Sequence, residues 1–526
     1  MEHIELVVLF LLVTVAALTS LSRLLGVPYP IVLVIGGSLV GFAPGVPDVL
    51  LDPDLVLLVF LPPLLFNAAY TSSIRELRSS LRAITLTSIG LVLLTTCSVA
   101  VVAHAAIDGL PWAAAFALGA IVSPTDPLAA TAIMRRLGVP RRLTAVIEGE
   151  SLVNDGTALV AYRTAVAAAA GGTFDLLQAT GDFVLDVAGG IAIGVVAGVV
   201  LVKVFRKLVG DDVVGVVLSL AAGYIAYIPA EEIGVSGVLA AVGVGLIVGY
   251  HAPEISTPAS RLRGYGFWEV LVFLLNAVLF VLVGLQLPTI LEAQDRSAIQ
   301  LIGLAALISA VVIGTRMLWV NTTPYVLRAL DRRPQQVARR VGWRQRQIAG
   351  WSGLRGSVSL AAALAIPLTT DGGGAFPERA LIIFLAFAVL LVTLVGQGLT
   401  LGPLINGLGI EDDGQEGQED TLARRRAAEA ALVRLDELGE PDWISPESVG
   451  RARQMFDYRE RRFGALEDGA DENFEDRADA WRRLMYDLFD AQRQELLELR
   501  NRGEISEDIR RSVERDLDLE ETRIQN

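Results

Sequence analysis

The sequence predicts an all-α polytopic membrane protein with about thirteen transmembrane helices and a helical tail. The chain has 526 residues, of which 53% are hydrophobic and only 19% are charged, and its mean hydropathy is +0.52. Runs of about twenty apolar residues recur along it, the length that crosses a bilayer as a helix. Because Cys97 is the one cysteine, a disulfide framework and a thiolate metal cluster are excluded. A soluble enzyme and a secreted scaffold are therefore both excluded.

Charge divides the chain into two parts. Residues 411–526 contain 33 acidic and 19 basic residues, so they account for the whole net charge of −14. We expect residues 1–410 to form the transmembrane domain and residues 411–526 to form an acidic, mostly helical, regulatory tail. An isoelectric point near 4.9 argues against a nucleic-acid partner, which needs a basic face.

Thirteen apolar ranges are predicted to cross the membrane as helices. They are 4–22, 28–46, 51–69, 83–106, 112–134, 143–170, 183–203, 213–229, 234–250, 267–288, 299–325, 348–369 and 378–402. The chain starts with Met1-Glu2-His3, without the basic start of a cleavable signal, so the first range is expected to remain as a helix.

The loops between these ranges alternate in basic residues. One set of loops carries 20 Lys and Arg residues, whereas the other set carries only Arg296 and Arg379. Because basic loops stay on the cytoplasmic side, the alternation predicts an external N-terminus and a cytoplasmic tail in a plasma membrane.

The fifth range contains a carboxylate between prolines, in the segment Ser123-Pro124-Thr125-Asp126-Pro127. The prolines remove backbone donors, so the helix is expected to break here and to leave free carbonyl groups at membrane depth. Unwound backbone at that depth survives only inside protein or beside a water-filled cavity. Asp126 is therefore a candidate ion-site residue. The alternative is a proline kink, with Asp126 capping the second half-helix.

The sixth range carries four polar groups within two helical turns. Ser151 and Asp155 lie one turn apart on one face, and Glu150 and Asn154 share the neighbouring face. A hydroxyl beside a carboxylate suits a hard monovalent cation, and no His/Cys cluster indicates a transition metal. Glu148, nearer the end of the range, is expected to pair with the arginines of residues 135–142.

The twelfth range places Arg355 in an otherwise apolar segment. A buried guanidinium needs an anion, and Glu150 is the expected partner because Asp126 and Asp155 are expected at the ion site. The alternative is that Arg355 extends to the cytoplasmic interface.

Other polar residues within the ranges carry weaker predictions. Pro62 and Pro63 in the third range predict another proline break, followed by the lone amide of Asn67. A kinked packing helix with a hydrogen-bonded Asn67 is the alternative. Arg163 and Arg316 also fall within ranges, and we expect no functional role for either.

Small residues in the seventh range predict a close helix contact. Gly190, Gly194 and Gly198 recur at every fourth position, the spacing that lets two helices approach closely in a membrane. His104 and Cys97 in the fourth range are expected to fill the core.

Four motifs occur in order within these ranges. They are Leu61-Pro62-Pro63-Leu64, Ser123-Pro124-Thr125-Asp126-Pro127, Glu150-Ser151-Leu152-Val153-Asn154-Asp155 and Gly353-Leu354-Arg355-Gly356. Together they resemble the sodium/proton exchangers of the cation:proton antiporter-1 family, and the resemblance covers roughly residues 1–408. It implies a homodimer built from inverted repeats, with a dimerisation domain and a moving six-helix core.

The resemblance also implies the roles of individual residues. It implies a cation site formed by Asp155, Ser151, Asp126 and the main-chain carbonyl of Thr125, and a structural ion pair between Glu150 and Arg355. In this family an asparagine before the key aspartate, here Asn154, marks electroneutral exchange. Many relatives carry an acid where this chain has Asn67, so a contribution of the third range to the site is in doubt.

A carboxylate that holds either a cation or a proton makes the two compete for one site. If only the neutralised states cross the membrane, exchange is one for one, and Asn154 carries no second proton. The expected function is electroneutral exchange of Na⁺, and also Li⁺, for H⁺ by alternating access, for pH and sodium homeostasis, without a cofactor. A K⁺/H⁺ antiporter of the same fold and a cation channel are the alternatives. An intramembrane hydrolase is disfavoured because no histidine lies near Ser151.

The tail is expected to start with an acidic linker at residues 411–416. Helices are predicted near 421–438, 447–464, 474–502 and 504–521, with an apolar stripe within 481–500 that could pack against a partner tail or within its own chain. The absence of a Gly-rich phosphate loop argues against nucleotide sensing. Autoregulation or dimer support is the expected role, and a passive, partly disordered extension is the alternative.

Overall fold

The computed structural model describes residues 4–44, 53–171, 176–207, 212–330, 341–370, 372–410, 414–439, 443–468, 472–502 and 504–525. The chain divides into two compact units, Met1–Asp412 and Asp413–Asn526. Residues 411–413 of the predicted linker, and the facing ends of the second and third predicted ranges, lie outside the described residues.

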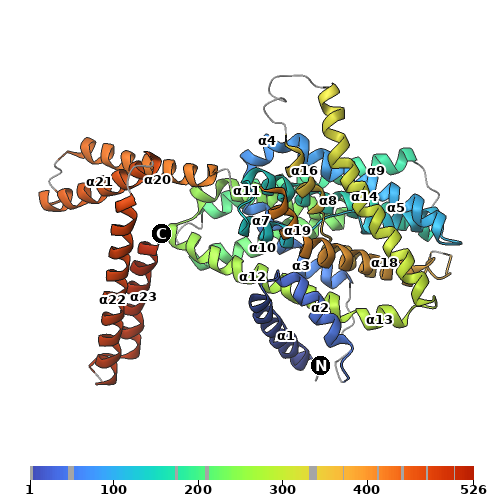
Figure 1. Cartoon of the computed structure of the whole chain (residues 1–526), viewed down its shortest axis with the longest axis horizontal. Helices are drawn as coiled ribbons and strands as arrows, with labels where there is room; N and C mark the ends of the chain where they lie inside the picture. Colours follow the sequence, from blue (N-terminus) through green and yellow to red (C-terminus); the bar gives the residue numbers. More distant parts are fainter. Residues whose placement is uncertain are drawn as a thin grey trace. The chain divides into compact units, whose positions relative to one another are not determined.

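Helices occur in all of the thirteen predicted ranges. In chain order the first unit contains α1 (Ile4–Leu25), α2 (Tyr29–Gly41), α3 (Pro53–Tyr70), α4 (Ile74–Thr85), the π-helical η1 (Leu86–Leu91), α5 (Val92–Ala106), α6 (Trp112–Ile121), α7 (Leu128–Arg136), α8 (Arg141–Ala170), α9 (Leu176–Lys207), α10 (Asp212–Ile233), α11 (Gly237–Ile255), α12 (Pro258–Leu285), α13 (Leu287–Glu292), α14 (Ala298–Leu330), α16 (Trp343–Trp351), α17 (Ser357–Leu364), α18 (Arg379–Leu391), the π-helical η2 (Val392–Gln397) and α19 (Gly398–Leu408) (Figure 1).

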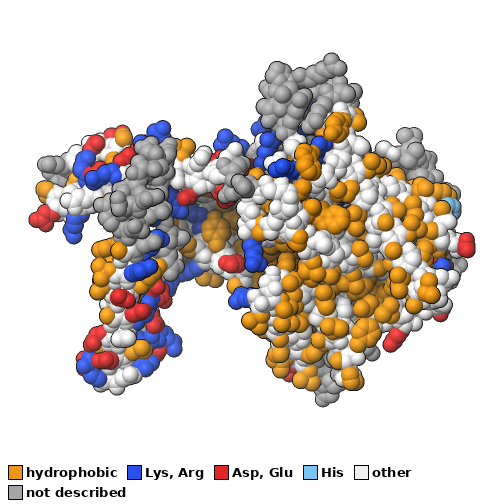
Figure 2. All heavy atoms as spheres, in the orientation of Figure 1, with side chains coloured by type: hydrophobic (Ala, Val, Ile, Leu, Met, Phe, Trp, Pro, Cys, Tyr) orange, Lys and Arg blue, Asp and Glu red, His pale blue; other side chains and the backbone are white. Residues whose placement is uncertain are grey.

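The surface of this unit is apolar. Among the described residues, eight helical segments are long and apolar enough to cross a membrane, and α2, α6 and residues 57–70 of α3 are apolar but shorter. Leu24 and Ile299 are each 85% exposed, and hydrophobic side chains cover most of the visible face of the unit (Figure 2). Apolar side chains can face lipid because lipid tails are themselves apolar. Each helix also satisfies its own backbone groups, as the bilayer requires. The chain is therefore an all-helical membrane protein, and the number of thirteen spans remains a prediction.

The glycine spacing of the seventh range produces the predicted close contact. A Cβ atom added at Gly190 would overlap the backbone of Ser236, and one at Gly194 would lie 2.5 Å from the carbonyl oxygen of Ala240. These contacts join α9 to α11 along their length, because only a residue without a side chain fits between the two backbones.

The prediction of a break in the third range is wrong. α3 continues from Pro53 to Tyr70 with Pro62 and Pro63 inside it. The two prolines still lack donors, but neighbouring helices can pack against the backbone they loosen, and Gly223 of α10 lies directly against the carbonyl group of Pro62. A continuous packing helix is the better description of α3.

Two of the helices are broken near the middle of the unit. The predicted break lies between α6 and α7, where residues 122–127 are not helical. A second break, which the sequence did not predict, lies between α16 and α17 at residues 352–356. We call these stretches the first and second unwound segments.

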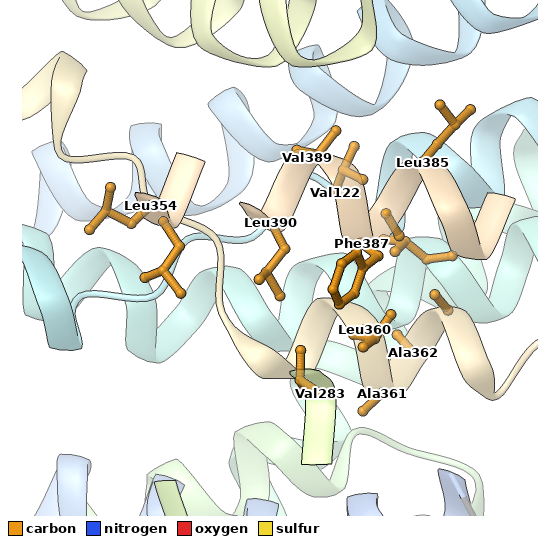
Figure 3. Close-up of a cluster of buried hydrophobic side chains, with 14 of the residues drawn as sticks. Val122, Val283, Leu354, Leu360, Ala361, Ala362, Leu385, Phe387, Val389 and Leu390 are labelled. Atoms are coloured by element: carbon orange, nitrogen blue, oxygen red, sulfur yellow. The ribbon is translucent and has the colours of Figure 1, made fainter. Parts of the chain in front are cut away.

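Both unwound segments lie inside the apolar core. Leu354 on the second segment and Val122 on the first are fully buried. Around them lie Phe387 and Leu390 of α18 and Leu360 of α17 (Figure 3). Irregular backbone at this depth is thus enclosed by protein, as the absence of water in a bilayer requires.

The second unit consists of two pairs of helices. They are α20 (Gln415–Leu438), α21 (Pro446–Asp468), α22 (Glu472–Asn501) and α23 (Glu507–Gln525). Phe489 and Leu517 are buried between α22 and α23, and Arg493 joins these helices through Asp518 at 2.7 Å. Leu484 and Leu488 of the predicted stripe are 49% and 46% exposed, so the stripe is only partly covered within this unit.

Candidate cation site

Asp126 lies at the end of the first unwound segment, directly before α7. Its carboxylate accepts a hydrogen bond from the backbone N–H of Leu128, the first residue of α7, at 2.9 Å, and the N-cap residue of that helix is Pro127. Its own N–H donates to the carbonyl oxygen of Leu354 at 2.8 Å. The two unwound segments therefore meet through a backbone hydrogen bond at the candidate ion-site residue.

Arg355 binds the carbonyl groups that the first break leaves free. Its guanidinium donates to the carbonyl oxygens of Ser123 and Pro124, the latter at 2.8 Å. The residue is 2% exposed, which excludes extension to the interface. The guanidinium of Arg355 and the carbonyl groups that the break leaves without helical partners bind each other, which offsets the cost of burying each of them.

The expected ion pair between Glu150 and Arg355 is wrong. The partner of Glu150 is Arg316 of α14, which donates to both carboxylate oxygens, the second at 3.3 Å. Both side chains are nearly fully buried, at 3% and 4% exposure. Arg316 also donates to the carbonyl oxygen of Ala349 at 3.1 Å. The sequence predicts no role for Arg316, because a hydropathy pattern does not show which of two arginines at membrane depth reaches a given acid.

A chain of hydrogen bonds connects this ion pair to the first unwound segment. The hydroxyl of Thr125 donates to Glu150 at 3.1 Å. The amide of Asn154 donates to the same hydroxyl at 2.9 Å and to the carbonyl oxygen of Thr125 at 3.3 Å. Asn154 and Thr125 are almost fully buried, so the network holds the unwound backbone against α8.

Asp155 and Ser151 lie one turn apart on α8, and both are partly buried. Asp155 follows Asn154 and Asp126 follows Thr125, and the hydrogen bonds between Asn154 and Thr125 bring these two stretches of backbone together. Asn67 is half-buried on α3, and within the described residues no hydrogen bond connects its side chain to these carboxylates.

The atoms at this place that could coordinate a cation are all oxygens. Two carboxylates, a hydroxyl and a freed carbonyl group suit a hard cation. Within the described part of the chain, no group of three or more His, Cys, Asp and Glu side chains is arranged to hold a metal ion.

Other charged residues in the apolar ranges take part in ordinary pairs. Glu148 pairs with Arg135 at 2.6 Å, which confirms the predicted partner. Arg163 near the end of α8 pairs with Glu231 of α10. Glu231 also accepts from the N–H of Gly237 at 3.0 Å, at the start of α11.

The chain is similar in sequence to known exchangers. Residues 9–407 match the family described as sodium/hydrogen exchanger, transmembrane. An uncharacterized Na⁺/H⁺ exchanger of Mycobacterium tuberculosis is 37% identical over 527 residues, covering 98% of this chain and 96% of that protein. A low-affinity Na⁺/H⁺ antiporter of Synechocystis is 33% identical, with 86% and 83% covered. A sodium, potassium, lithium and rubidium/H⁺ antiporter of Bacillus subtilis is 33% identical, with 82% and 66% covered.

The fold is also similar to a solved structure. The sodium proton antiporter of Methanocaldococcus jannaschii superposes with a TM-score of 0.59, covering 77% of this chain and 100% of that one, at 19% identity.

Proposed function

Because this chain belongs to the sodium/hydrogen exchanger family, we propose that it exchanges one monovalent cation for one proton where its two unwound segments meet. The protein is a secondary transporter and not an enzyme. The proposed cation ligands are the side chains of Asp155, Asp126 and Ser151 and the main-chain carbonyl of Thr125.

One observation carries this proposal. The N–H of Asp126 is bound to Leu354, and the residues directly before Asp126 and Asp155, Thr125 and Asn154, are hydrogen-bonded to each other. Two partly buried carboxylates near each other are stabilised when a cation or a proton reduces their charge. Since a cation and a proton each do this, the two compete, and alternating access to the two sides turns the competition into exchange.

The residue directly before Asp155, Asn154, supports electroneutral exchange. Asn154 is an amide that donates to Thr125, so it adds no titrating group to the site. Glu150 is paired with Arg316, so the charges of this pair balance each other. One proton therefore leaves for each monovalent cation that binds.

Na⁺, with Li⁺, is the proposed cation. Names of several relatives support Na⁺, and the name of the Bacillus subtilis relative adds K⁺ and Rb⁺, which keeps K⁺ as the alternative. A channel is not favoured, because the described polar groups gather at one enclosed place rather than along a pore.

We also propose the setting of this exchange. The chain is a homodimer of inverted repeats with a moving six-helix core in the plasma membrane, with its N-terminus outside and its tail in the cytoplasm, and it serves pH and sodium homeostasis. The tail regulates exchange or supports the dimer. Truncation after residue 412 should then change the rate, the apparent cation affinity or the pH profile, and an unchanged exchanger would remove this role.

Proteoliposomes that contain the purified protein test the proposal. Na⁺, Li⁺ and K⁺ are added outside while internal pH is followed, and the membrane potential is set with a potassium gradient and an ionophore, or with a choline-balanced control. We expect Na⁺-driven proton movement that is independent of the potential. A strong dependence on the potential would contradict electroneutrality, and a response to K⁺ alone would replace the cation.

A further inference from the structure

We infer that Thr393 is a positioning residue of the cation site, because its hydroxyl orients the peptide group that holds Asp126. This inference rests on the proposed function of the site. Thr393 lies in the π-helical turn η2, outside the four motifs of the sequence, and is completely buried. Turns of this kind are frequent at functional sites.

The hydroxyl of Thr393 is bound within its own helix. It donates to the carbonyl oxygen of Val389 at 2.8 Å, one turn earlier, and also lies 3.2 Å from the carbonyl oxygen of Leu390. With its hydrogen used in this way, the oxygen accepts from the backbone N–H of Arg355 at 3.2 Å. The hydroxyl of Thr393 in η2 therefore binds the second unwound segment at one atom, the backbone nitrogen of Arg355.

The same peptide group is held at its other end by Asp126. The N–H of Arg355 and the C=O of Leu354 belong to one planar unit, and that C=O accepts from the N–H of Asp126 at 2.8 Å. Because the peptide unit is rigid and planar, its N–H and C=O cannot turn independently. The hydroxyl of Thr393 thus determines where the carbonyl group of Leu354 points, and through it where the backbone of Asp126 lies.

Gly356 shows how little displacement the site tolerates. A Cβ atom at Gly356 would overlap the carboxylate of Asp126, so this carboxylate fills the space that a side chain would take. A small rotation of the Leu354–Arg355 peptide would therefore move Asp126 against the backbone of Gly356. Loss of the acceptor on Thr393 also leaves a buried N–H without a partner, which favours such a rotation.

The test compares three single variants in proteoliposomes. Thr393→Val keeps the shape of the side chain and removes the acceptor, whereas Thr393→Ser keeps the hydroxyl. Thr95→Val is the matched control, because Thr95 is also buried and its hydroxyl has no hydrogen-bond partner among the described residues. We expect Thr393→Val to raise the KM for Na⁺ about tenfold and to change the preference between Na⁺ and K⁺. Thr393→Ser and Thr95→Val should remain close to the wild-type protein.

A second measurement does not depend on transport. Amide hydrogen exchange of the peptide that covers residues 122–130 should be faster in Thr393→Val than in Thr393→Ser. If Thr393→Val does not accumulate in membranes, Thr393→Ala gives the same comparison with a smaller side chain.

The outcomes separate this inference from the proposed function. A wild-type protein that moves no protons in response to any cation contradicts the proposed function, and the amide exchange still decides the role of Thr393. A wild-type KM and cation preference in Thr393→Val would overturn this inference alone. So would a lower rate with an unchanged KM, because a general packing defect does not act through the position of Asp126.

Discussion

Replacing Arg316 with methionine should destabilise the protein strongly, since it leaves Glu150 buried without its charged partner. The two side chains are 3% and 4% exposed, so water cannot replace the guanidinium. Removing one partner of such a pair costs about 3–5 kcal/mol of unfolding free energy. The measurement is thermal unfolding of the variant in detergent.

An exposed pair of the same unit provides the matched control. Arg135 and Glu148 are 71% and 34% exposed, so Arg135→Met should cost at most about 1 kcal/mol. The double variant Arg316→Met with Glu150→Gln no longer contains the unpaired carboxylate, and more than half of the lost stability should return. The reasoning is refuted if Arg316→Met costs no more than Arg135→Met, or if the double variant is less stable than Arg316→Met alone.

Two further predictions concern glycines. Gly356→Ala should raise the KM for Na⁺ and slow exchange, because its Cβ overlaps the Asp126 carboxylate; a wild-type KM in vesicle assays would argue against the described position of Asp126. Gly194→Ala should lower the free energy of unfolding by about 2 kcal/mol, since the new Cβ meets backbone atoms of Ala240 that cannot move aside. Gly181→Ala on the same helix is the control for thermal unfolding: nothing lies within 4 Å of its Cβ, so it should be neutral or stabilising by up to about 1 kcal/mol.

Much of the helical arrangement could be predicted from the sequence. Apolar runs long enough for a bilayer identify helices, because lipid leaves the backbone no alternative. The break at residues 122–127 was predicted correctly from Pro124 and Pro127. The same argument failed for Pro62 and Pro63. Proline removes a donor in every case, but the surroundings decide whether the helix ends or only bends.

The second break and the partner of Glu150 could not be predicted in this way. Residues 352–356 contain no proline. Their backbone unwinds where Asp126 and Thr393 bind it and where the side chain of Arg355 binds Pro124, contacts between residues far apart in the chain. Arg316 and Arg355 look equivalent in a hydropathy pattern. Gly353 is the position in the sequence that makes room for Arg316, since a Cβ atom there would overlap the Arg316 side chain. Only the fold shows which side chain takes that space.

Proton release on sodium binding tests the central claim most directly. The purified protein in weakly buffered detergent is titrated with Na⁺ at a pH at which the empty site is protonated, and the released protons are counted. The account predicts about one proton for each Na⁺ bound by the wild-type protein and none for Asp155→Asn. Sodium binding without proton release, or undiminished release from Asp155→Asn, would contradict competition of the two ions at Asp155.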